Sequence, residues 1–259
     1  MKNLLSAILI LALTGCSHYY YAPNAANIPL FKEKNTFKLK GGYSGDNYNG
    51  ADIQMAYSVS KKIGVMVNSF FAGKTENVQE YITTPAYHQE SGKGSYIETG
   101  LGYYKPFGEH NVWIFETYGG AGVGGEKHVY NYSQSASLHL TKYFIQPSFG
   151  YSSKDGHFEF AISSRFSGLD LKIKHNNLFL QTNQLENQNL DSISLHPSSF
   201  LWEPSFIIAA GGKYLKLYLQ LTFSNNLSNP YLVMDNENIS FGIKIMFKND
   251  QKKINSSNN

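Results

Sequence analysis

The sequence predicts an all-β chain, an antiparallel up-and-down barrel of about ten strands. Two observations predict it: short stretches in which apolar and polar residues alternate, and connections that are alternately short and long. The composition agrees, because aromatic residues make up 15% and charged residues only 16% of the chain. Abundant Tyr, Phe and Gly with few charges favour strands over helices. We find no stretch after the leader with a long helical period.

Each predicted strand carries apolar side chains at every second position. The first, for example, alternates Phe37, Leu39 and Tyr43 with Lys38 and Lys40. A period of two is typical of strands that have one apolar face. In chain order the predicted strands lie at 37–43, 53–59, 63–71, 97–103, 113–116, 143–151, 158–166, 202–208, 215–223 and 239–247.

The connections indicate how these strands are arranged. Short turns at 60–62, 106–111, 152–156 and 211–213 alternate with long, polar, loop-like connections at 74–94, 125–139, 172–198 and 225–237. In an antiparallel meander all short turns then lie at one end and all long loops at the other. Two residues conflict with regular strands, because Pro147 and Pro204 cannot donate a ladder hydrogen bond. We expect them at bulges or at strand ends.

A separate signal lies at the start of the chain. Lys2 precedes the apolar run Leu4 to Leu13, which is too short to cross a membrane as a helix and fits a signal-peptide core. The residues Leu13-Thr14-Gly15-Cys16 resemble the lipobox of bacterial lipoproteins. This resemblance implies that residues 1–15 are removed and that Cys16 carries acyl chains such as palmitate. Cys16 is also the only cysteine, so the chain forms no internal disulfide.

The region 35–248 resembles the outer-membrane β-barrels in architecture, although not in any motif. The resemblance implies a transmembrane β-barrel with short periplasmic turns, long outer loops and strands of about ten residues. Alternation alone does not say which face is outside. The membrane interpretation is favoured because charged and small residues gather on the polar faces, while aromatic residues gather on the apolar faces. The alternative is a periplasmic, lipocalin-like carrier with an apolar interior.

A barrel of this size is narrow, so we expect inward side chains to fill most of it. The predicted polar network in the lumen consists of Arg165, Glu203, Glu98, Glu116 and Glu159. Arg165 and Glu203 are expected to pair at mid-barrel. The segment 16–34 is expected to be either a lipid-anchored tether or a plug of the barrel. The polar tail 249–259 is expected to be disordered.

The function is constrained mainly by what the sequence lacks. The net charge of +3 gives no case for nucleic acid. No catalytic residues, metal ligands or cofactors are predicted, because the histidines and carboxylates show no characteristic spacing. We expect an outer-membrane protein with a scaffold or surface-interaction role. The expected partners are outer-membrane lipid and other envelope proteins. A narrow solute channel and the apolar-ligand carrier stay open as alternatives.

Overall fold

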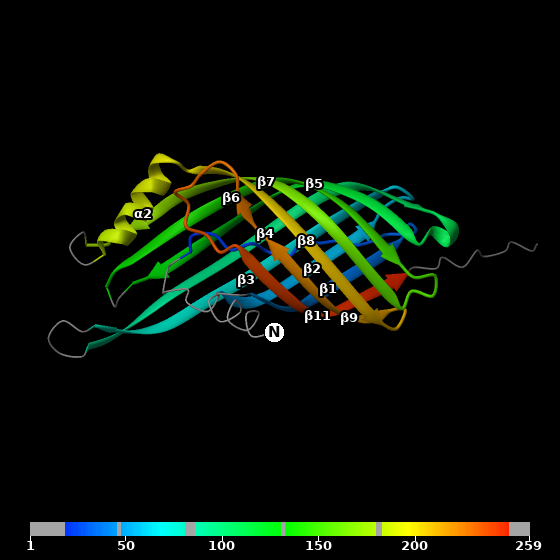
Figure 1. The fold of residues 1–259 in the computed structure, drawn as a ribbon, viewed down its shortest axis with the longest axis horizontal. Helices are drawn as coiled ribbons and strands as arrows, with labels where there is room; N and C mark the ends of the chain where they lie inside the picture. The colour runs from blue at the N-terminus through cyan, green and yellow to red at the C-terminus, as the bar shows by residue number, and fades with distance from the viewer. Residues whose placement is uncertain (1–18, 46–47, 81–85, 131–132, 180–182, 249–259) are drawn as a thin grey trace, which may run out of the picture.

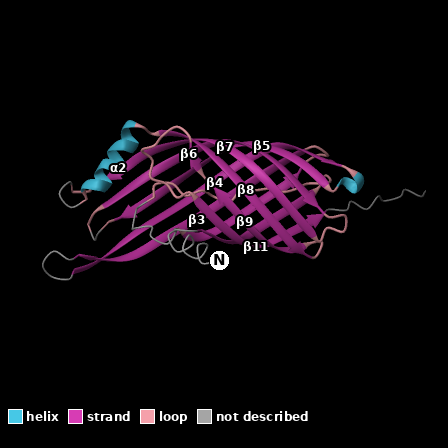
Figure 2. Cartoon of the chain, viewed as in Figure 1, coloured by secondary structure: helices cyan, strands magenta, loops and turns pink. Residues whose placement is uncertain are grey.

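The computed structural model describes residues 19–45, 48–80, 86–130, 133–179 and 183–248. The signal peptide, Cys16 and the tail 249–259 lie outside the described residues. Ten long strands form one closed antiparallel barrel (Figures 1 and 2). The strands are β1 (Thr36–Gly45), β2 (Asn49–Ser58), β3 (Ile63–Glu80), β4 (Ala86–Phe107), β5 (Trp113–Val129), β6 (Ser135–Ser152), β7 (Phe158–Asn176), β8 (Ser198–Gly211), β9 (Leu215–Phe223) and β11 (Glu237–Lys248).

The topology is the predicted up-and-down meander. Each strand pairs with its neighbours in sequence, and β11 closes the barrel against β1 in a register that runs from Thr36↔Lys248 to Gly45↔Ile239. A two-residue strand, β10 (Asn225–Asn226), pairs with β8 beyond the end of β9. The prediction of an all-β, antiparallel barrel of about ten strands is therefore confirmed.

The two ends of the barrel differ, although only two of the four connections that were predicted to be long are long. The short turns fall at 59–62, 108–112, 153–157 and 212–214, and the second of them holds the 3-10 turn η1 (Glu109–Asn111). Two long connections, 177–197 and 224–236, lie at the opposite end, where Figure 1 also shows the β3–β4 hairpin and a helix projecting. We call these the short-turn end and the long-loop end.

Two expectations about the long-loop end are wrong. The stretches 74–94 and 125–139 are largely strand, since β3 runs to Glu80, β4 starts at Ala86, and β5 and β6 span to Val129 and from Ser135. Backbone pairing needs no apolar face, so polar strand extensions give no alternation signal. The second error is α2 (Gln184–Leu195), a helix inside the expected loop 172–198. Only short-range apolar spacing marks it, with Leu190 and Ile193 buried.

None of the helices in the described part of the chain is long and apolar enough to cross a membrane.

The barrel turns its apolar faces outward. Leu101, Ile145 and Leu217 are 61%, 56% and 70% exposed, whereas the alternating residues Glu116 and Arg165 are 0% and 1% exposed. The outer surface is therefore an apolar belt around a mainly polar mid-lumen. Apolar side chains also gather inside the barrel in separate clusters, around Ile28, Leu30 and Phe31 and at the long-loop end.

At that end the inward positions carry an apolar core instead of the expected polar lining. Leu138, Leu140, Leu169 and Leu171 point inward there and pack with Leu190 of α2. The long strands extend past the apolar belt, and the inward side chains of this extension form an apolar core with α2.

Both prolines lie within strands, next to breaks in the ladder. Pro147 keeps its register with β5, while the β6–β7 pairing lapses between Ile145 and Ser148. Pro204 pairs in register with Ser164 of β7, and its other side falls between the β9 and β10 pairings. Each proline thus lies where the pairing on one side lapses, so no neighbouring carbonyl group lacks a donor because of it. The one register shift of the β6–β7 pair lies elsewhere, between Ser137 and Leu138.

The seam between β1 and β11 depends on a pair of glycines. Gly42 and Gly242 face each other in the register. A Cβ on Gly42 would lie 2.1 Å from the carbonyl oxygen of Phe241, and one on Gly242 would lie 2.3 Å from that of Gly41. The first and last strands therefore approach more closely here than side chains allow.

Gly42→Ala is expected to destabilise the barrel by about 1–3 kcal/mol, because overpacking at the seam forces the backbone apart. Gly168→Ala is the matched control, since a Cβ there would meet no atom within 4 Å. Its effect should stay within about 0.5 kcal/mol. Denaturant unfolding of the refolded protein in detergent measures both. Equal effects of the two substitutions would contradict this account of the seam.

Candidate functional site in the barrel lumen

The lumen is occupied by the protein's own N-terminal segment. Residues 19–34, which we call the plug, run in extended form from the long-loop end to the short-turn end (blue in Figure 1). Tyr20, Ala25 and Phe31 are fully buried inside the barrel. The chain then turns at Asn35, whose φ of 59° is left-handed, and enters β1.

At the long-loop end the plug pairs with the connection that precedes β11. The backbone N–H of Tyr20 donates to the carbonyl oxygen of Val233 at 2.9 Å. The Tyr20 hydroxyl lies 2.8 Å from that of Tyr130 and donates to Glu186 of α2 at 2.5 Å. Burial raises the pKa of Tyr130 above its ordinary value, so this hydroxyl stays protonated. The helix and the outer connections therefore cap the plug's entrance.

In the middle of the lumen the wall satisfies the plug's backbone. An isolated extended segment cannot bond to itself, and a buried carbonyl without a partner is costly. Glutamines from three different strands donate to three consecutive plug carbonyls: Gln54 to Ala25 at 2.8 Å, Gln220 to Ala26 at 2.8 Å and Gln146 to Asn27 at 2.7 Å. The plug is thus bound on several sides by neutral amides.

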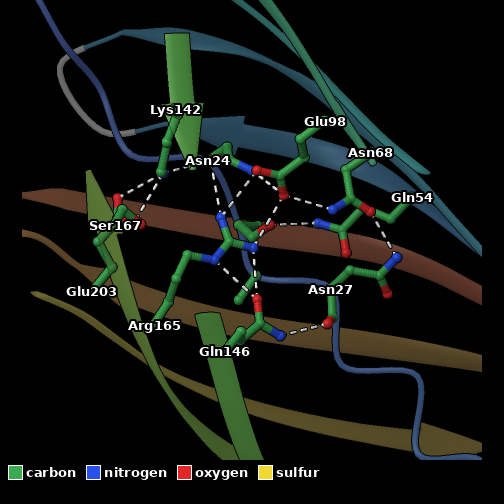
Figure 3. Close-up of polar contacts among 12 residues, drawn as sticks. Asn24, Asn27, Gln54, Asn68, Glu98, Lys142, Gln146, Arg165, Ser167 and Glu203 are labelled. Atoms are coloured by element: carbon green, nitrogen blue, oxygen red, sulfur yellow. Dashed lines mark hydrogen bonds and ion pairs between the residues drawn. The ribbon is translucent and has the colours of Figure 1, made fainter. Parts of the chain in front are cut away.

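Arg165, the single arginine of the chain, is the centre of the polar network (Figure 3). Its two terminal nitrogens contact both carboxylate oxygens of Glu98 at 3.1 and 3.3 Å. Its Nε and Nη2 also donate to Gln146 at 2.9 and 2.7 Å, and Nη1 donates to Asn24 of the plug at 3.3 Å. The Phe144 ring lies 4.7 Å from the guanidinium carbon. Each guanidinium nitrogen therefore has a partner in a site that excludes bulk water.

Glu98 receives further donors that fix it in place. Asn68 of β3 donates to it at 2.6 Å, Tyr96 at 3.0 Å and Asn24 at 3.2 Å. Three wall strands and the plug meet at this one carboxylate. Such a shared network stabilises the assembled state only when all its members are present.

The expected pairing of Arg165 with Glu203 is wrong in detail. The two are direct register partners on β7 and β8, yet Arg165 reaches across to Glu98. Glu203 instead binds Lys142 at 2.8 Å, accepts a hydrogen bond from Ser167 at 2.8 Å, and accepts another from the hydroxyl of Tyr21. A long arginine side chain spans the lumen, while Lys142 on β6 supplies the nearer cation.

Glu116 lies apart from that network and binds the backbone of the plug. Its two oxygens accept the N–H groups of Leu30 and Phe31 at 2.9 and 2.8 Å. Leu30 has a φ of 57°, a left-handed conformation that costs a branched residue about 1–2 kcal/mol. Two consecutive N–H groups directed at one anion offset that cost. Glu116 therefore holds a turn that the plug does not favour alone.

Glu159 forms a third group at the short-turn end. Its carboxylate lies 2.6 Å from Lys244, 3.4 Å from Lys216 and 3.7 Å from Lys38. Close by, Lys32 donates to the carbonyl oxygens of Ser152 and Ser153 at 2.8 and 2.9 Å. Partial burial lowers the pKa of Lys32 from its ordinary value.

All five residues of the predicted network lie inside the barrel, but in three separate places. Glu98, Arg165 and Glu203 share the mid-lumen, Glu116 binds the plug, and Glu159 faces lysines. The partners Lys142, Gln146 and Asn24 were not among the predicted site residues. Lys142 and Gln146 share the inward parity of β6, which is the signal that would have identified them. Asn24 gave no signal, because the plug's path through the lumen follows from no periodicity.

Among the described residues, no group of three or more His, Cys, Asp or Glu side chains is arranged to hold a metal ion. No family model matches the chain, and no curated protein is significantly similar to it in sequence. The polar side chains of the lumen bind the plug and compensate one another's charges.

Arg165→Ala should destabilise the barrel by about 3–5 kcal/mol, because Glu98 keeps its charge without the guanidinium. A double-mutant cycle with Glu98→Ala should give a coupling energy above about 1 kcal/mol, and the corresponding cycle with Glu203→Ala a smaller one. Unfolding in detergent provides the free energies. Lys105→Ala, on an exposed lysine of β4, is the control and should change stability by less than about 0.5 kcal/mol. A larger coupling to Glu203 would contradict the network.

Proposed function

We propose that this protein is a lipid-anchored outer-membrane β-barrel, closed by its own plug, with a structural or surface-interaction role. The observation that carries the proposal is the distribution of side chains: an apolar belt outside and an ion-paired lumen inside. Water-soluble barrels have the opposite distribution, because burial of apolar surface drives their folding. An exposed apolar area of this extent favours contact with lipid.

The dimensions and the aromatic residues support the same conclusion. The shortest barrel strand, β9, has nine residues, and a tilted strand needs about 9–11 residues to cross a bilayer. Trp113 lies at the start of β5, where it stacks on Phe149 and contacts Tyr151 and Phe160. Trp202 lies toward the other end of the belt, opposite Phe166. Aromatic girdles at two levels are typical of membrane barrels.

The plug disfavours the channel alternative. Backbone and side chains of residues 19–34 occupy the lumen, and wall residues from several strands bind them. A solute would have to displace these hydrogen bonds, including those that Asn24 forms with Glu98 and Arg165. A structural or interaction role agrees better with a filled barrel that projects α2 and long hairpins from one end.

The path of the plug supports a lipid attachment on the side of the long loops. Tyr19 and Tyr20 lie at the long-loop end, whereas β1 starts at the short-turn end. Cys16 precedes Tyr19 by three residues, which span at most about 11 Å when extended. The acyl chains of Cys16 therefore belong to the leaflet next to the long loops. The anchor and the loops then share one side of the membrane.

Leu101→Lys tests whether the belt contacts lipid. Leu101 lies near the middle of a ten-residue crossing that starts at Phe107, and a lysine facing the bilayer midplane costs about 2–4 kcal/mol. Leu185→Lys on α2 is the matched control, since the two leucines are 61% and 68% exposed. Refolding into lipid vesicles, followed by heat-modifiable gel migration, measures the difference. Equal tolerance of both substitutions, with release of a Cys16→Ser variant as a soluble protein, would support the carrier alternative.

The side of the anchor is tested with epitope tags. One tag is inserted after Ser17, one in the short turn between Lys61 and Lys62, and one after His196 at the long-loop end. When antibody is applied to intact cells, the Ser17 and His196 tags should behave alike, either both labelled or both unlabelled. The turn tag should then be unlabelled in the first case and labelled in the second. Labelling of the Ser17 tag together with the turn tag would contradict the path of the plug. Acyl labelling that is lost in Cys16→Ser tests the anchor separately.

A further inference from the structure

Five lysines contribute to the lining of a cavity at the short-turn end. It has a volume of about 190 Å³ and lies beside the point where the plug leaves the barrel. Its lining includes Lys32, Lys38, Lys213, Lys216 and Glu159. One water needs about 10–15 Å³ by this measure, so the cavity has room for a multi-atom solute.

The charges around this cavity do not balance. Lys38, Lys216 and Lys244 are 6%, 3% and 6% exposed, and all three approach the single carboxylate of Glu159. Glu116 is the other buried carboxylate nearby, and its two oxygens already accept the plug's N–H groups. Neutral N–H donors do not cancel the charge of Glu116, so three buried ammonium groups against two carboxylates leave an excess of one positive charge.

The rim adds to this excess. Lys32, Lys154 and Lys213 line the opening together with Glu33 and Asp155. Glu33 forms an ion pair with Lys248 at 3.0 Å. Asp155 accepts hydrogen bonds from Ser153 and the His157 backbone within its own turn. Glu33 is thus offset by Lys248, which leaves Asp155 as the one further carboxylate beside the three rim lysines.

Donors inside the cavity are available for a ligand. An ammonium group carries three N–H donors. Lys216 lines the cavity, and its contacts to Glu159 and to the Lys213 carbonyl are both 3.4 Å long. Buried charged groups in a narrow cleft focus the potential and attract counter-ions.

We propose that this cavity binds a small phosphate-bearing dianion at the short-turn end of the barrel. A phosphate group carries about two negative charges near neutral pH, enough to offset the buried excess of one and to engage the rim lysines as well. Its acceptor oxygens can meet Lys216 and the rim lysines together. A monocarboxylate carries only one negative charge. The site needs no membrane, so it stands independently of the proposed function.

The test is calorimetric titration of the full-length protein in detergent with inorganic phosphate, glycerol 3-phosphate and acetate. Both phosphates should bind at least about tenfold more tightly than acetate, and added salt should weaken their binding. Tighter binding of glycerol 3-phosphate would identify an esterified source such as a lipid headgroup, and tighter binding of inorganic phosphate would identify the free ion.

Variants locate the site. Lys216→Gln should weaken phosphate binding by about tenfold, because one charge-assisted hydrogen bond is lost. Lys213→Gln, on an exposed rim residue that folding does not require, should weaken it less. Lys61→Gln, in the neighbouring short turn, should leave it unchanged. Binding of phosphate no tighter than acetate, or an equal effect of Lys61→Gln and Lys213→Gln in the folded protein, would overturn the proposal.

Discussion

The structure depends on one constraint: an extended, buried segment must have its backbone polar groups satisfied by the wall around it. The plug has no sheet partner along most of its length. Gln54, Gln220 and Gln146 donate to its carbonyls, and Glu116 accepts its N–H groups. The polar inner face of the barrel therefore provides specific hydrogen-bond partners for residues 24–31 of the plug. In a lumen filled with water alone, these side chains would lack the carbonyl and N–H groups of the plug as partners.

The charged groups of the lumen follow from the same constraint. Each charge inside a narrow barrel loses hydration and must be offset by a partner and by hydrogen bonds. The pairs Arg165–Glu98 and Lys142–Glu203 meet this condition through Asn24 and Tyr21 of the plug as well as through the wall. Barrel and plug are thus one network at mid-lumen. Around Glu159 lysines outnumber carboxylates, and this excess of positive charge is the basis of the ligand site proposed at the short-turn end.

Much of the fold could be predicted from the sequence, because each strand of an antiparallel barrel alternates apolar and polar residues with a period of two. Strand order, the short turns and the inward position of Arg165 and Glu203 all follow from alternation and turn length. The extensions of β3 to Glu80 and of β4 from Ala86 left no such signal, since polar strands lack an apolar face. The partner of Arg165 was not predictable either. Alternation gives the side of the wall on which a side chain lies, but not how far it reaches across the lumen.

The position of the plug also couples closure of the barrel to its own filling. The plug continues directly into β1, and β1 is the strand that closes the barrel against β11. Before that seam forms, residues 19–34 can reach the lumen from the side. After it forms, the segment can enter only by threading through one end of the barrel, past the side chains that line it. The contacts of Asn24 and Tyr21 with their charged partners therefore favour closure of the barrel, the step in which β1 pairs with β11 and Gly42 meets Gly242. In a closed barrel without the plug, Glu116 and several amides would lose these partners, and this loss favours the filled state.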